Sequence, residues 1–215
     1  MTRWVAGVRL RAPALALSLA ILAACVGAGP PVQLRKEELA GARAAACAAP
    51  DAPRVRFAKT VDARPDPSAL GAIGGRRFGS VEVAAWIDDE LAAIASPGFR
   101  VASGEVPDPG ARLVVRPRIV KAYVDGVVFT KTAVVVLAFD VTAQGGEAVS
   151  RMYRGQQAGV NWAASQSEGS GALRDAAMSC LEQLRADLER MLHPSAPVPR
   201  ACAPLSPEPE AAWDR

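Results

Sequence analysis

The stretch 111–160 constrains the fold more than any other part of this chain. It is rich in valine, isoleucine and aromatic residues, which favour β-strands, and two turn sequences interrupt it. Asp125-Gly126 predicts a tight hairpin, and 144–147 predicts a second one. Pro117 lacks an amide proton, so it predicts a strand edge or a bulge. The predicted antiparallel strands span 112–124, 128–142 and 149–160.

Two amphipathic helices and two shorter strands accompany this meander. Ser80 and Pro97 bracket the first helix, whose apolar side chains recur on one face, and His193-Pro194 ends the second. We therefore predict an α+β fold: a mostly antiparallel sheet of four to five strands with two helices packed on one face. The two shorter strands are predicted over 55–61 and 99–102, a glycine-rich surface loop over 68–79, and the second helix over 171–192.

The N-terminus reads as an export signal. Three arginines precede a short apolar run that ends in Leu22-Ala23-Ala24-Cys25. A basic region, an apolar core and small residues before the cleavage point are typical of a secretory signal peptide. A cysteine directly after the cut makes this sequence a lipobox, so we predict that 1–24 is removed and that Cys25 carries a lipid anchor. Two alternatives are a transmembrane anchor and an ordinary signal peptide beside a chance cysteine.

The predicted domain plan follows from this leader. Val26 stands where an aspartate would favour inner-membrane retention, so we expect the outer membrane, with the protein facing the periplasm. Leu34 and Leu39 offer too thin an apolar face for much burial, which predicts a linker. The predicted parts are the signal peptide 1–24, the lipidated N-terminus and linker 25–52, a single α+β domain 53–193, and a proline-rich disordered tail 194–215.

Charge gives no sign of nucleic-acid binding. The chain holds 25 basic and 22 acidic residues, and the segment 1–24 contributes three arginines and no acids. The mature protein is therefore balanced, and we predict no nucleic-acid partner. The cysteines fit an oxidising compartment, and Cys47 and Cys202 flank the predicted domain. We predict a Cys47–Cys202 disulfide, with pairing of Cys180 to either one as the alternative; Cys180 itself lies on the apolar stripe of the second helix. The same stripe predicts a solvent-facing Glu182 and the burial of Leu181, Leu184 and Leu188.

Arginines and a tryptophan are the candidate partner-binding residues. Arg64 follows the first strand, and with Arg76 and Arg77 it could contact an anion or a lipid headgroup. In the structural alternative, Asp62 bonds the next turn and Arg64 pairs with a carboxylate. Trp162, with Tyr123 and Tyr153, would mark a binding surface if exposed and ordinary sheet packing if buried.

The sequence shows no catalytic or cofactor motif. His193, the only histidine, lies at a helix C-terminus, where capping is its expected role. No serine stands in a nucleophile elbow, and no cysteine or histidine spacing fits a metal site. We therefore predict no catalytic residues, no metal and no cofactor. A carboxylate pair among the 22 acids would support the enzyme alternative, a cell-wall or lipid hydrolase.

Taken in order along the chain, these features resemble the YajG-type family of bacterial lipoproteins. The resemblance rests on the lipobox, Val61-Asp62-Ala63-Arg64-Pro65, the segment through Gly71, Gly98-Phe99 and Tyr153-Arg154-Gly155, and it covers about 53–192. It implies a small envelope domain without catalytic residues, held at the membrane by its lipid. It also implies a fold like that of auxiliary lipoproteins of lipid ABC transporters. We therefore expect a binding protein for an envelope protein or lipid, with a transporter subunit as the alternative.

Overall fold

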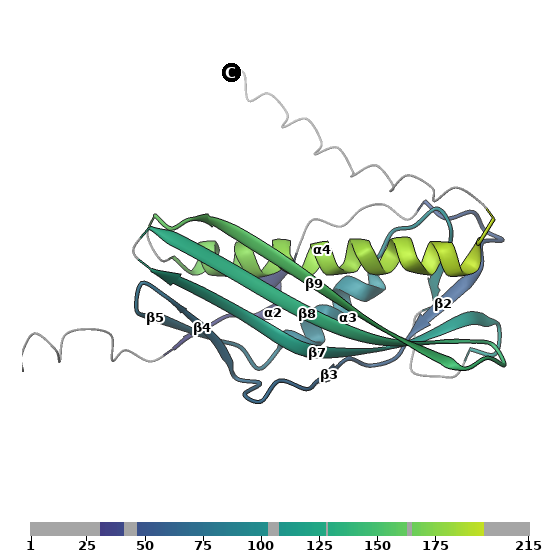
Figure 1. Ribbon diagram of the computed structural model, residues 1–215, viewed down its shortest axis with the longest axis horizontal. Helices are drawn as coiled ribbons and strands as arrows, with labels where there is room; N and C mark the ends of the chain where they lie inside the picture. The colour runs from purple at the N-terminus through teal and green to yellow at the C-terminus, as the bar shows by residue number, and fades with distance from the viewer. Residues whose placement is uncertain (1–30, 41–46, 103–107, 128, 163–164, 196–215) are drawn as a thin grey trace, which may run out of the picture. The chain divides into compact units, whose positions relative to one another are not determined.

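The computed structural model describes residues 31–40, 47–102, 108–127, 129–162 and 165–195 (Figure 1). The predicted signal peptide, Cys25, Cys202 and the segment from 196 onward lie outside these residues, so predictions about them stay untested. The described residues form one mixed sheet of nine strands and three helices. The α+β class is confirmed. The expected four to five mostly antiparallel strands are too few, because several parallel strands of two to five residues are too short to show an alternating pattern.

The predicted meander is confirmed as the long-stranded part of the sheet. It consists of β7 (Ala111–Val127), β8 (Thr130–Ala143) and β9 (Ala148–Val160), drawn as three long arrows in Figure 1. The expected hairpin turn at Asp125-Gly126 is wrong, since the pairing of β7 with β8 continues to Val127 and Thr130. Asp125 and Gly126 stay extended because β4 (Ala69–Ile73) pairs with them on the other side.

Short strands pair in parallel with the other edge of β7. β2 (Arg54–Phe57), β3 (Val61–Asp62) and β4 follow one another along it, and β6 (Arg100–Ala102) extends the sheet beyond β2. The single strand expected over 55–61 is therefore two strands. Phe57 pairs with Val115 and Val61 with Arg118, so the break lies beside Pro117. A proline offers no amide proton to a neighbouring strand, which is tolerable where that strand is interrupted.

The loop expected over 68–79 is a β-hairpin. β4 pairs antiparallel with β5 (Arg76–Gly79), and β1 (Val32–Gln33) adds to β5 in parallel. Gly74 and Gly75 connect β4 to β5 with φ of 54° and 81°, the left-handed values that a type I′ turn requires at both positions. Two adjacent glycines between strand-forming residues are a hairpin signal, so this element was predictable from the sequence.

The segment 31–40 belongs to the folded domain and is not a linker. It contains β1 and α2 (Lys36–Leu39), and Leu34 and Leu39 are both buried in the main core. The Leu34 amide donates to the Gly79 carbonyl at 2.8 Å, and the Lys36 ammonium lies 2.9 Å from an Asp89 carboxylate oxygen. Two leucines are enough to anchor this segment because β5 and the helices supply the rest of the surface that encloses them.

The two long helices cover one face of the sheet. The apolar residues of α3 (Val83–Ala92) and α4 (Gln166–Leu192) share one core with the inward-facing residues of β7 and β8. α4 starts five residues before its predicted start, at the Ser165 N-cap, whose capping box with Glu168 was readable in the sequence. Gly169 lies against the Phe78 ring, so glycine serves close packing there. No helix in the described parts of the chain is long and apolar enough to cross a membrane.

Cys180 is a free, fully buried thiol, as its place on the apolar stripe predicted. Burial raises its pKa from the ordinary value of 9.0 to about 11. The folded state therefore keeps a proton that the unfolded chain releases, and this contribution is complete below pH 9 and lost as pH rises toward 11. We expect the free energy of unfolding to fall across this window, and to fall less in Cys180→Ala, as measured by urea denaturation from pH 7.5 to 11. Parallel pH profiles for the two proteins would contradict this assignment.

Candidate functional site

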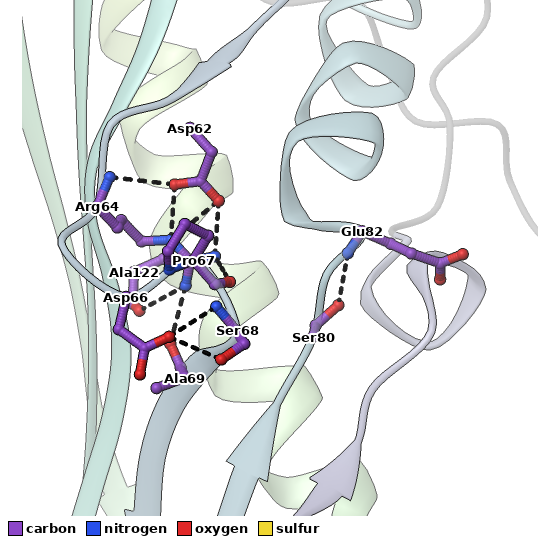
Figure 2. A network of polar contacts seen from close by, with 9 residues as sticks. All are labelled: Asp62, Arg64, Asp66, Pro67, Ser68, Ala69, Ser80, Glu82 and Ala122. Carbon is purple, nitrogen blue, oxygen red and sulfur yellow. Dashed lines mark hydrogen bonds and ion pairs between the residues drawn. The ribbon is translucent and has the colours of Figure 1, made fainter.

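Arg64 lies in the interior, at the centre of a polar network (Figure 2). Its guanidinium pairs with both oxygens of Asp62: Nε to Oδ1 at 2.9 Å and Nη2 to Oδ2 at 2.7 Å. The remaining donors reach backbone carbonyls of Pro67, of Ala69 at 2.9 Å and of Ala122 at 3.5 Å. This guanidinium therefore joins the end of β3, the turn after it, β4 and β7.

These contacts favour the structural interpretation of Arg64. Its side chain is only 4% exposed, and six hydrogen bonds within the protein leave little for an external anion. In the same turn, the Ser68 hydroxyl and amide donate to Asp66 at 2.7 and 3.0 Å. These hydrogen bonds lower the pKa of the Asp66 carboxyl.

The other three candidate residues lie at one end of the sheet, the opposite end of the β4–β5 hairpin from Arg64. Arg76 and Arg77 are exposed at the start of β5, and Ile73, the partner of Arg76, also pairs with Gly126 near the end of β7. Trp162 follows the last residue pair of β9 and is 86% exposed. The structure thus brings Arg76, Arg77 and Trp162 to the same end of the sheet, where the β7–β8 hairpin also turns.

The exposed aromatic cluster that would mark a binding surface does not form. Tyr153 is buried beneath α4, its ring 5.8 Å from that of Phe139, and its hydroxyl donates to Asp187. Burial and this hydrogen bond raise the pKa of Tyr153, so it remains neutral. Tyr123 lies on the opposite face of the sheet and is 39% exposed. Tyr153 therefore packs in the core, and of these three aromatic residues only Trp162 and Tyr123 could contact a partner.

The carboxylates that line the described cavities are already paired within the protein. His193 ends α4 as predicted, but its Nε2 lies 2.9 Å from the carbonyl of Gly98, which anchors the loop before β6. Among the described residues no three histidine, cysteine or acidic side chains could hold a metal ion. The main cavity described, of about 550 Å³ beside the end of α3, has one carboxylate in its lining, Asp89, and that carboxylate already pairs with Lys36.

The helix-free face of the meander carries a row of basic side chains that the sequence reasoning missed. On β7 they alternate with inward residues such as Leu113, Val115 and Ile119, and β9 adds one opposite Val136. All five are exposed, against two carboxylates on this face, Asp125 and Asp140. We call this set the cationic sheet face; it consists of Arg112, Arg116, Arg118, Lys121 and Arg154.

Few of these charges are neutralised within the protein. Arg118 lies 3.5 Å from Asp140, and Arg154 donates to Gln156 at 3.1 Å. Arg112, Arg116 and Lys121 make no ion pair within the described residues. The signal was present as basic residues at alternate positions of a predicted strand. A balanced total charge hid it, because net charge says nothing about which face the charges share.

Comparison with known proteins yields only distant likenesses. No family model and no curated protein matches the chain. A Xanthomonas campestris crystal structure described as family DUF330 has 15% identity, covers 69% of this chain and 90% of its own, and has a TM-score of 0.46. A hypothetical protein of Chlamydia trachomatis has 13% identity, coverages of 66% and 98%, and a TM-score of 0.44. Lipoprotein GNA1162 of Neisseria meningitidis has 11% identity, coverages of 61% and 97%, and a TM-score of 0.34.

Likenesses with identities and TM-scores this low carry no argument about this chain. The resemblance to YajG-type lipoproteins therefore stays a prediction, and the evidence for a function comes from the residues of this chain.

Proposed function

We propose that this chain is a lipid-anchored bacterial envelope protein that binds an anionic envelope component through its cationic sheet face and catalyses no reaction. The anchor is inferred from the leader and from Leu22-Ala23-Ala24-Cys25. The binding role rests on one observation, the exposed row of basic side chains on the helix-free face. The disulfide between Cys47 and Cys202 and placement in the outer membrane belong to this proposal as predictions.

Electrostatics explains why such a face favours an anionic partner. Alternate residues of a strand lie about 7 Å apart on one face, so Arg116 and Arg118 are within a Debye length of each other. Neighbouring like charges on a sheet face repel and lower the stability of the folded state. A partner that carries negative charge relieves this repulsion, and the positive field speeds its approach. Such binding weakens as the salt concentration rises.

The cavity geometry does not favour the hydrolase alternative. A glycosidase-like site needs two carboxyl groups facing one another across the substrate. The largest cavity described offers only Asp89, which pairs with Lys36. A smaller one is lined by Glu168 and Asp175, but these carboxylates pair with Lys131 and Arg174. In the alternative, the protein is a transporter subunit that binds its partner by the same chemistry. Identifying the partner would therefore decide between the two functions.

A crosslinking experiment in cells tests the binding role. A photo-crosslinking amino acid in place of Lys121 should give adducts with an anionic envelope component. The same amino acid in place of Glu182, which is exposed on α4, should give none. The double variant Arg116→Ser/Arg118→Ser should lower the adduct yield of the Lys121 position by about 5- to 30-fold, which is the loss of about 1–2 kcal/mol from two exposed charge contacts.

A matched control distinguishes binding through the cationic sheet face from a general effect of positive charge. Arg35→Ser/Arg190→Ser removes two exposed positive charges from the helix layer and should leave the yield unchanged. Equal losses in the two double variants, or equal adducts at Lys121 and Glu182, would contradict binding through the cationic sheet face.

A further inference from the structure

Exposed apolar side chains gather at one end of the sheet. Two lie at the turn of the β7–β8 hairpin, and two lie at the end of β9. Their exposed fractions run from 50% to 86%, whereas monomeric proteins seldom display large apolar side chains together without a function. We call this set the apolar tip; it consists of Val127, Phe129, Val160 and Trp162.

Hydrogen bonds hold the apolar tip in place. The side chain of Asn161, itself 5% exposed, donates to the Val127 carbonyl at 3.4 Å, and its backbone amide donates to the Phe129 carbonyl at 3.1 Å. The amide of Trp162 donates to the Glu168 carboxylate at 3.0 Å, which ties it to the start of α4. The backbone that carries the apolar side chains is therefore fixed by hydrogen bonds. A partner can contact these side chains without a change in the fold.

The chain enters the domain from the same end. β4 runs toward the tip, since Ile73 pairs with Gly126, and β5 and the parallel β1 run away from it. β1 therefore begins on the tip side of the sheet. Five residues of sequence lie between Cys25 and Pro31, so their Cα atoms can be at most about 20 Å apart. A lipid on Cys25 would thus hold this end of the domain close to a membrane.

We infer that the apolar tip docks into the phospholipid leaflet that holds the Cys25 lipid. Tryptophan and phenylalanine are suited to the boundary between headgroups and acyl chains. Arg76 and Arg77, exposed on the neighbouring hairpin, lie where they can reach lipid phosphates. The inference rests on the lipidation in the proposed function, and it adds an orientation: the long strands stand away from the membrane and display the cationic sheet face sideways.

Fluorescence of Trp162 tests this docking. The protein is produced with its signal peptide in a bacterial host, purified with its lipid, and placed in phosphatidylethanolamine–phosphatidylglycerol vesicles. Trp213→Phe removes the tail tryptophan, and Trp86 is buried. Brominated acyl chains should quench Trp162 emission at least twofold relative to plain lipids. In the same background Phe129→Ser should reduce the quenching at least twofold without changing the melting temperature, because Phe129 is exposed.

A matched tryptophan at the other end of β5 provides the control. Val81 is 81% exposed and follows β5, which runs away from the tip. Trp162→Phe/Val81→Trp should show less than one fifth of the quenching of Trp162. Vesicle-bound protein with equal quenching at both positions, or with none at Trp162, would overturn the inference. A photo-crosslinking residue in place of Trp162 that reacts with protein and not with lipid would also overturn it. The mass of the mature N-terminus reports lipidation separately, so failure of the anchor is distinguishable from failure of docking.

Discussion

Replacing Arg64 by alanine is expected to lower the free energy of unfolding by about 3–5 kcal/mol, because it leaves the Asp62 carboxylate without its buried partner. The loss also removes the hydrogen bonds that join the turn after β3 to Ala69 and Ala122. Urea denaturation followed by far-ultraviolet circular dichroism measures the change. The effect should be among the largest for any single polar residue here, since Arg64 is the only arginine counted among the buried residues of the described chain.

Two further variants make the Arg64 prediction specific. Arg112→Ala, on the cationic sheet face, should change stability by less than about 0.5 kcal/mol because its side chain is exposed. Asp62→Ala should destabilise by a similar amount to Arg64→Ala, and the double variant by much less than the sum, because each single variant strands the other charge. If Arg64→Ala melts like the unmodified protein yet loses its crosslinks to a partner, the partner-binding interpretation of Arg64 is the right one.

Leu184→Ala should cost about 2–5 kcal/mol of the free energy of unfolding. Leu184 is fully buried in the middle of α4, between the sheet and the other core residues, so the substitution removes apolar contacts and leaves a cavity. The position was predicted from the stripe that it shares with Leu181 and Leu188, and the structure confirms that all three are buried.

The neighbouring position supplies the control for Leu184. Glu182 is exposed, as its place off the stripe predicted, and Glu182→Ala should change stability by less than about 0.5 kcal/mol. Thermal melts of the two variants side by side measure the difference. Similar losses in both would show that helix α4 packs through a different face in solution.

The cationic sheet face and the apolar tip differ in how far the sequence predicted them. The alternation that predicted β7 also implied that Arg116 and Arg118 share a face, although total charge concealed it. The apolar tip was only partly readable: Trp162 was singled out, but Phe129 was placed inside a predicted strand. Its exposure depends on where the hairpin turns, and pairing with β4 on one edge and β8 on the other moved that turn beyond Asp125-Gly126.

The sequence by itself determined the long meander, the two long helices and the buried positions of Leu184 and Cys180, because each depends on a periodic pattern within one segment. Only the tertiary structure decided the parallel pairing of the short strands, the burial of Leu34 and Leu39, and the interior place of Arg64. Strands of two to five residues are too short to show how they pair, and they pair where β7, β5 and β2 offer free edges. The guanidinium of Arg64 is buried because β7, through the Ala122 carbonyl 58 residues away in sequence, packs against the local turn that supplies its other partners. No local pattern records that long-range contact.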